Sequence, residues 1–152
     1  MNKQKYGLRK ITKNDYDFIY QVKKNAYKKY VEINFGNWDE EQQKEYFNRF
    51  IETYKDGAYI ITFDGQDIGF YNGCIENNTY EIGNICIIPK YQNMGIGTSI
   101  LKDILLDNCD KKITIQYFKQ NHVGRLYERL GFKLVGETSF HYQMEKEKSK
   151  TH

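Results

Sequence analysis

The sequence has 152 residues, a formal net charge of +3 and 39% apolar residues. This length is typical of one globular domain, which can bury a core without disulfides or metals. No stretch approaches the about 20 apolar residues of a membrane-spanning helix, and the scattered lysines argue against a nucleic-acid-binding protein. We therefore expect one soluble domain over residues 1–146 and a disordered polar tail at 147–152, with no membrane or nucleic-acid partner.

The three cysteines, Cys74, Cys86 and Cys109, are odd in number and widely spaced. This spacing fits neither a disulfide framework nor a zinc site, so we expect free thiols in a reducing compartment and no bound metal. The basic start of the chain is not followed by an apolar run, and a secretory signal is therefore not predicted. Together these features predict a cytoplasmic protein.

The first third of the chain predicts one strand and two helices. Residues 8–11 alternate apolar and polar side chains, as a strand does. Residues 12–15 resemble a capping box, and apolar side chains at helical spacing follow over residues 18–27. A second helix is predicted after Trp38, because three acidic residues occupy its first turn. We expect an irregular junction, rich in aromatic side chains, between the two helices at residues 30–38.

The next three predicted strands form an antiparallel meander. Residues 58–63 are rich in β-branched side chains, and the Asp-Gly pair after them is a hairpin signal. Residues 68–75 pair back, a second turn follows at the asparagines 77–78, and residues 80–88 form a long strand. Pro89 ends this strand, because proline lacks the N–H that a sheet ladder requires.

After Pro89, helices and strands alternate along the chain. The predicted elements are a helix from residue 96 to just before 110, a strand at 113–117, a helix at 123–130 and strands at 132–135 and 140–144. Since β-α-β connections join parallel strands, part of the sheet must be parallel. The order β-α-α-β-β-β-α-β-α-β-β predicts an α/β fold with a mixed, mostly antiparallel sheet and helices on both faces.

A glycine-containing loop joins the strand that ends before Pro89 to the following helix. Its glycines let the backbone approach a ligand, and the first helical turn adds unpaired N–H groups and the positive end of the helix dipole. Such a loop is typical of a pyrophosphate site, although two glycines can also serve only as a tight turn. The predicted site comprises Gln92, Asn93, Met94, Gly95, Ile96, Gly97 and Thr98.

The pattern Q-x-x-G-x-G at residues 92–97 resembles the coenzyme A loop of the GNAT (Gcn5-related N-acetyltransferase) superfamily. The order of the predicted elements is also that of the GNAT fold. The resemblance implies a V-shaped splay in the central sheet, where the strand before the loop leaves its neighbour and pairs its backbone with the pantetheine arm of the cofactor. The strand residues implied in this pairing are Ile85, Cys86 and Ile87.

Residues 121–132 resemble the second GNAT signature, N-x-x-A-x-x-L-Y-E-x-L-G-F. By this resemblance, Tyr127 reaches the sulfur of coenzyme A and protonates the leaving thiolate, and Asn121 holds the pantetheine amides. The usual alanine is replaced, and the asparagine lies six residues before the tyrosine instead of the more frequent seven. Gln120, at the seventh position, is the alternative to Asn121. A tyrosine on the apolar face of a helix can also be a core residue.

The resemblance implies an enzyme that transfers acetyl from acetyl-CoA to a primary amine by direct attack in a ternary complex. The amine must first lose a proton, because an alkylammonium with a pKa near ~10.4 is not a nucleophile. Glu81 matches the position of the base in the histone-acetylating branch of the family, with water as the alternative base. A backbone N–H near residues 85–87 would stabilise the oxyanion. A non-catalytic acyl-CoA-binding module of the same fold is the alternative function.

The sequence leaves the acceptor open between a small-molecule amine and a peptide amine. Aromatic and acidic residues at the junction of the first two helices would suit a cationic amine, and in the GNAT fold the last strand also borders the acceptor. The residues that we expect to bind the acceptor are Tyr30, Glu32, Trp38 and His141. Helix packing is the alternative role for the first three. The resemblance also admits a homodimer.

Overall fold

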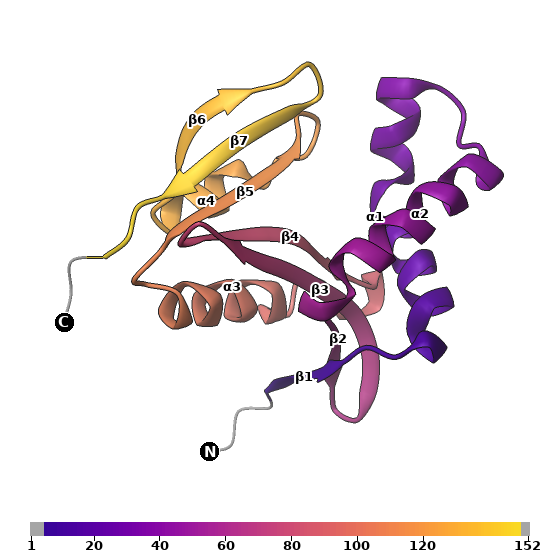
Figure 1. Cartoon of the computed structure of the whole chain (residues 1–152), viewed down its shortest axis with the longest axis horizontal. Helices are drawn as coiled ribbons and strands as arrows, with labels where there is room; N and C mark the ends of the chain where they lie inside the picture. Colours follow the sequence, from indigo (N-terminus) through magenta and orange to yellow (C-terminus); the bar gives the residue numbers. More distant parts are fainter. Residues whose placement is uncertain (1–4, 150–152) are drawn as a thin grey trace. The chain divides into compact units, whose positions relative to one another are not determined.

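The computed structural model describes residues 5–149. It contains seven strands and four α-helices, in the order predicted (Figure 1). These are β1 (Tyr6–Lys10), α1 (Tyr16–Phe35), α2 (Glu40–Tyr54), β2 (Ala58–Phe63), β3 (Gln66–Glu76), β4 (Thr79–Ile87), α3 (Ile96–Asp107), β5 (Lys112–Phe118), α4 (Gly124–Arg129), β6 (Lys133–Glu137) and β7 (His141–Lys146). Within these residues, no helix has both the length and the apolarity to cross a bilayer.

The strands are hydrogen-bonded in the order β1-β2-β3-β4-β5-β7-β6. β4 and β5 are parallel, whereas β1–β2, β2–β3, β5–β7 and β6–β7 are antiparallel. The β4–β5 ladder runs only from the Thr79–Lys112 pair to the Glu81–Thr114 pair, although β4 continues to Ile87 and β5 to Phe118. The mixed, mostly antiparallel sheet is confirmed, and the early end of this ladder is the interruption that the predicted splay requires.

One boundary differs clearly from the prediction. The junction expected to be irregular at residues 30–38 is helical as far as Phe35, so Tyr30 and Glu32 belong to α1. The helix ends at Gly36, whose φ of 97° lies in the left-handed region. Helix propagation adds one hydrogen bond for each residue that it fixes, so a helix continues until a residue such as glycine supplies a terminating conformation.

The described chain divides into two compact units. The first contains residues 5–72 and 84–98, and the second contains residues 73–83 and 99–149. The chain passes from one unit to the other within β3, β4 and α3. The expected single domain at 1–146 and the tail at 147–152 stay predictions. Residues 150–152 of that tail lie outside the described range, and the Ser149 N–H donates to the Cys109 carbonyl at 2.8 Å.

In the first unit, α1 and α2 pack on one face of the strands (Figure 1). The buried residues of this core are Ile19, Tyr20, Val22, Phe47, Ile51, Ile60, Phe70 and Cys86. Since successive strand residues point to opposite faces, Ile87 lies on the other face. There, a Cβ added to Gly97 in the first turn of α3 would lie 3.7 Å from Ile87 Cδ1. Helices therefore contact both faces of the strands in this unit.

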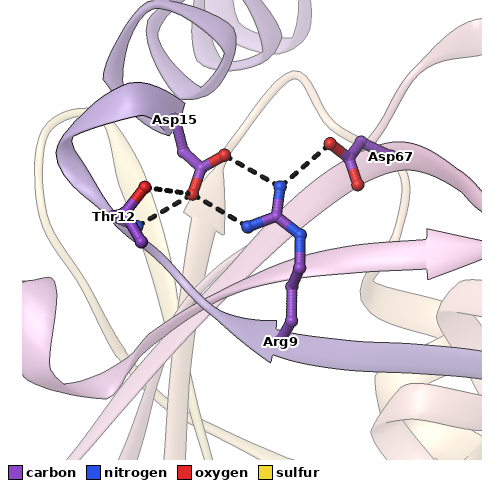
Figure 2. Close-up of polar contacts among 4 residues, drawn as sticks. All are labelled: Arg9, Thr12, Asp15 and Asp67. Atoms are coloured by element: carbon purple, nitrogen blue, oxygen red, sulfur yellow. Dashed lines mark hydrogen bonds and ion pairs between the residues drawn. The ribbon is translucent and has the colours of Figure 1, made fainter.

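Arg9 connects three segments of the first unit (Figure 2). Its guanidinium donates hydrogen bonds of 3.0 and 2.8 Å to Asp15 and one of 2.9 Å to Asp67. Asp15 also accepts a hydrogen bond of 2.8 Å from the backbone N–H of Thr12, within the predicted capping box. The hydrogen bonds from Arg9, with those from Thr12, lower the pKa of Asp15. The hydrogen bonds of this Arg9 cluster (Arg9, Thr12, Asp15 and Asp67) connect β1 and the start of β3 to the beginning of α1.

Candidate active site

The glycine-containing loop lies within the first unit, between β4 and α3. Gln92 closes it, because Nε2 of this side chain donates to the Ile87 carbonyl at 2.7 Å. Asn93 and Gly95 have φ angles of 63° and 82°, and this left-handed backbone turns the chain into α3. Glycine and asparagine adopt this conformation at the least cost. The Gln92 side chain therefore stabilises the start of the predicted loop, and Asn93 and Gly95 have left-handed backbone conformations before the helix.

The two glycines of the loop fit a ligand that approaches the backbone. A Cβ built on Gly95 meets no atom within 4 Å, so the space outside this residue is open. In a helix interior glycine costs about 1 kcal/mol relative to alanine, and Gly97 lies in the first turn of α3, where alanine would also favour the helix. A Cβ there would meet only Ile87 at an ordinary contact distance, so packing does not require Gly97. With the unpaired amides of the first helical turn, the loop has the features of a pyrophosphate site.

Residues 85–87, predicted to pair with pantetheine, form the end of β4 in the same unit. Cys86 is 3% exposed and lies in the core under α1 and α2, and its Sγ is 3.4 Å from the Tyr27 hydroxyl. Burial raises the pKa of the Cys86 thiol. Because the thiolate is the nucleophilic form, this position does not suit an acetyl-cysteine intermediate.

A hydrogen-bonded set of polar side chains lies beside Cys86 and was not among the predicted site residues. The Tyr27 hydroxyl donates to Asn84 Oδ1 at 2.7 Å, and Asn84 Nδ2 donates to Asn72 Oδ1 at 2.8 Å. The ammonium group of Lys23 lies 5.1 Å from the centre of the Tyr27 ring. No motif marks these residues, because Tyr27 and Asn84 are 57 positions apart and only the fold brings them together.

In the second unit, Tyr127 is held between two aromatic rings. Its ring centre lies 5.5 Å from that of Tyr117 on β5 and 5.8 Å from that of Phe132. A Cβ on Gly124, one turn before Tyr127 on α4, would overlap the hydroxyl of Tyr117. The phenol of Tyr117 thus occupies the space that a side chain at residue 124 would need. The alanine of the GNAT signature corresponds to Gly124 or Val123.

Asn121 starts the turn that leads into α4. Its backbone N–H donates to the Phe118 carbonyl at 2.9 Å, and its Oδ1 accepts a hydrogen bond of 3.2 Å from the Val123 N–H. The side-chain oxygen thus supports the start of the helix, and the amide nitrogen is the part of Asn121 available to a ligand. The preference for Asn121 over Gln120 stays a prediction.

Glu81, the predicted base, also belongs to the second unit. It is exposed and lies at the last pair of the β4–β5 ladder, opposite Thr114. The Cys74 thiol lies 3.6 Å from its carboxylate and can donate to it. Glu81 and Tyr127 are therefore in the same unit, whereas residues 85–87 and 92–98 are in the other.

The residues predicted to bind the acceptor have structural contacts of their own. Tyr30 lies on α1 with the Lys29 ammonium 5.0 Å from its ring centre. Glu32 accepts a hydrogen bond of 3.2 Å from the backbone N–H of Trp38, so it supports the loop between α1 and α2. Trp38 packs against the core, and its buried indole N–H makes no hydrogen bond of good geometry within residues 5–149. It lies close enough to Glu40 and Tyr20 for its N–H to act on the pKa of both groups in the lowering direction.

His141, the fourth of these residues, lies at the start of β7 in the second unit. Its ring centre is 4.4 Å from that of Phe118, which is its partner in the β5–β7 ladder. Burial lowers the pKa of His141, which favours the neutral form of its imidazole. A neutral imidazole can both donate and accept hydrogen bonds.

Known proteins share both the sequence pattern and the fold. A family model described as an acetyltransferase (GNAT) domain matches residues 55–134. The chain is 27% identical to the 5-NmdU N-acetyltransferase of Pseudomonas phage PaMx11 over 139 residues, which cover 86% of this chain and 89% of that protein. It is 30% identical over 94 residues to the spermine/spermidine N(1)-acetyltransferase of Bacillus subtilis (strain 168), with 53% of this chain and 61% of that protein covered.

The fold is also shared with a solved structure. The PaiA N-acetyltransferase from Thermoplasma acidophilum, in complex with coenzyme A, matches with a TM-score of 0.69 and 21% identity. The match covers 93% of this chain and 98% of that chain. The expected α/β architecture is thereby confirmed over nearly the whole sequence.

Proposed function

Because the chain belongs to the acetyltransferase (GNAT) family, we propose that it is an N-acetyltransferase that uses acetyl-CoA and acetylates a primary amine. The observation that supports this proposal most strongly concerns Gly97. Packing would allow a larger residue there, and alanine would favour the helix more, so the glycine needs another explanation. A pyrophosphate lying against the backbone amides at residues 95–98 accounts for a glycine at this position. The loop would thus bind the end of the cofactor farthest from the acetyl group.

The cofactor supplies the thioester carbonyl carbon that the amine attacks. The backbone of residues 85–87 would orient the pantetheine arm, and one of its N–H groups would stabilise the oxyanion of the tetrahedral intermediate. Asn121 would hold the pantetheine amides through its Nδ2, because its Oδ1 accepts the Val123 N–H. Binding both substrates together makes the attack unimolecular, which is the main gain from proximity.

Tyr127 is the proposed acid for the leaving thiolate. Its ring lies between those of Tyr117 and Phe132, and this packing would fix the direction of the hydroxyl. A positioned acid of this kind contributes roughly 10²-fold or more to a rate. The base would be Glu81 or a water molecule, and Glu81→Gln separates the two, since only a base at this position would shift the pH-rate profile.

The acceptor is proposed to be a small-molecule amine. The relatives in the comparison are named for acetylating 5-NmdU and spermine or spermidine. In this chain, Tyr30, Glu32, Trp38 and His141 are proposed to contribute to acceptor binding.

A pair of glycine substitutions tests the proposed cofactor site. Gly95→Glu should lower the affinity for acetyl-CoA by at least about 100-fold, which is about 2.7 kcal/mol, because a carboxylate would face the pyrophosphate. Gly65 is the matched control, since it also has a left-handed φ, of 77°, and no atom within 4 Å of an added Cβ. Both variants carry the same backbone strain of about 1–2 kcal/mol. Calorimetry that finds equal affinity in Gly95→Glu and Gly65→Glu would reject the loop assignment.

Tyr127→Phe tests catalysis separately from binding. We expect release of free thiol to fall by about 100-fold with unchanged affinity for acetyl-CoA, since only the proton donor is lost. Tyr117→Phe is the control, because Tyr117, which lies on β5, contacts the Tyr127 ring and has no proposed chemical role. A wild-type protein that binds acetyl-CoA but releases no thiol with any amine would instead be a non-catalytic acyl-CoA-binding module.

A further inference from the structure

Four polar side chains lie on the face of β3 and β4 that α1 and α2 cover. They are Lys23 and Tyr27 of α1, Asn72 of β3 and Asn84 of β4, and we call them the Lys23 cluster. All four belong to the first unit, which also contains the loop at residues 92–98. Asn84 is next to the stretch 85–87, which is proposed to orient the thioester.

The hydrogen bonds of the cluster leave donors without acceptors. Tyr27 donates to Asn84 Oδ1, and Asn84 donates to Asn72 Oδ1, so each side-chain oxygen accepts one hydrogen bond. Asn72 is 2% exposed, and its amide nitrogen donates to no group within residues 5–149. A side-chain amide carries two N–H donors, and buried polar groups normally have partners. The missing partner of Asn72 is therefore an acceptor.

Lys23 adds a positive charge to these donors. Its ammonium lies 4.4 Å from the ring centre of Phe50 and 5.1 Å from that of Tyr27. Although Lys23 is partly exposed as a residue, protein atoms surround its ammonium, and this desolvation lowers its pKa. No carboxylate in residues 5–149 forms an ion pair with Lys23, whereas its neighbour Lys24 is 2.5 Å from Glu40. A desolvated charge without a counterion is costly, unless a ligand supplies one.

We propose that the Lys23 cluster binds an oxyanion of the acceptor, a carboxylate or a phosphate, and so selects amines that carry a negative group. This inference rests on the proposed acetyltransferase function. An ammonium without a carboxylate counterion in residues 5–149, and an amide –NH2 without an acceptor there, suit an oxyanion, which has acceptors and negative charge but no donors. The acceptor would thus be held beside the strand that orients the thioester.

The same cluster disfavours polycationic acceptors. A second ammonium near Lys23 would be repelled by the charge that Lys23 already carries. Nearby acidic side chains also have partners: Glu32 accepts the Trp38 N–H, and Glu40 binds Lys24 and the Tyr20 hydroxyl. The structure therefore favours an anionic amine over the cationic one that the aromatic and acidic residues of the helix junction suggested.

Four amines of similar length test the proposal in wild-type enzyme. They are 4-aminobutyrate with a carboxylate, O-phosphoethanolamine with a phosphate, n-butylamine without a second charge and putrescine with a second ammonium. We expect kcat/KM for one of the anionic amines to exceed that for n-butylamine by at least tenfold, with putrescine the poorest. Comparing the two anionic amines identifies the oxyanion. Equal rates for all four, or a preference for putrescine, would overturn the proposal.

The variant Lys23→Met connects this preference to the cluster. It should raise KM for the preferred anionic amine at least tenfold, leaving kcat with n-butylamine and the affinity for acetyl-CoA unchanged. Lys28→Met is the control, because Lys28 is exposed on the same helix. Equal loss with every amine would mean a structural role for Lys23. Weaker binding of acetyl-CoA would mean that the oxyanion belongs to the cofactor, and either result contradicts the proposal.

Asn72→Asp is a second variant for the case that Lys23→Met fails to fold. Its carboxylate would supply a negative charge within the cluster, so we expect the preference to move from the anionic amine toward putrescine. An unchanged order of amines in Asn72→Asp would contradict the proposal. If wild-type protein binds no acetyl-CoA, the proposed function itself fails. If it acetylates n-butylamine without preferring an anionic amine, only the present inference fails.

Discussion

The first unit contains two polar clusters with opposite balances of charge. In the Arg9 cluster, the guanidinium faces the carboxylates of Asp15 and Asp67, and the hydrogen bonds join β1, β3 and the start of α1. In the Lys23 cluster, the ammonium faces two aromatic rings, and no carboxylate of residues 5–149 forms an ion pair with it. A compensated charge stabilises the fold that contains it, whereas an uncompensated one costs stability and needs another reason to be retained. We take that reason to be ligand binding.

The largest effect on stability is expected at the Arg9 cluster. Asp15→Asn removes the charge that accepts both hydrogen bonds from Arg9, and we expect the free energy of unfolding to fall by about 2 kcal/mol, as measured by urea denaturation. Asp67→Asn is the control in the same cluster. Its side chain is 44% exposed, and we expect a loss below about 1 kcal/mol. A similar loss of unfolding free energy in Asp15→Asn and Asp67→Asn would contradict the expectation that the buried carboxylate contributes more than the exposed one.

Lys23→Met should behave in the opposite way. Replacing a desolvated, unpaired ammonium by an apolar side chain of similar length is expected to leave stability unchanged or raise it by about 1 kcal/mol. This gain should shrink as the pH rises toward 10.5, the pKa of lysine in the unfolded chain. Folding lowers the pKa of Lys23, so between its folded and unfolded pKa values the unfolded chain binds more protons than the folded one. The stability of the wild type therefore rises with pH over this interval. A clear loss of stability in Lys23→Met at pH 7 would show that the Lys23 ammonium stabilises the fold, as the charges of the Arg9 cluster are expected to do.

The smallest effect is a pH dependence at the start of α2. Hydrogen bonds from Lys24 and Tyr20 lower the pKa of Glu40 from 4.5 to about 2. A lowered carboxyl pKa stabilises the fold above its unfolded value and loses this contribution as the pH falls through the folded value. The difference in stability between wild type and Glu40→Gln should therefore disappear between pH 4.5 and 2. A difference that persists below pH 2 would contradict the ion pair as its cause.

The architecture could be predicted because its signals are local. β-branched runs, turn pairs and helical spacing placed all eleven elements in order, and Pro89 and Gly131 lie where β4 and α4 end. The same holds for the loop at residues 92–98, where neighbouring residues form both the turn and the helix start. The end of α1 was placed too early, because no change in the apolar pattern marks the Gly36 terminus.

The parts of the site that the sequence did not indicate depend on contacts between distant residues. The signature alanine corresponds to Gly124 or Val123, and the structure shows that the Tyr117 hydroxyl occupies the space that a methyl group on Gly124 would need. Trp38 and Glu32 are predicted to bind an acceptor, and the structure adds that the Glu32 carboxylate supports the backbone of Trp38. Whether a side chain has a partner across the fold cannot be seen in its spacing along the chain.

By itself, the sequence determined the family, the order of the elements and the glycine-containing loop at residues 92–98, since each follows from residues that are neighbours or lie a few turns apart. Only the tertiary structure decided which charges are paired. Arg9 donates a hydrogen bond to Asp67, which is 58 positions away in the sequence, and Tyr27 donates one to Asn84, which is 57 positions away. Lys23 forms no ion pair with a carboxylate in the described chain. Solvation and Coulomb energy depend on distances in space, so the difference between a structural charge and a ligand-binding one arises only on folding.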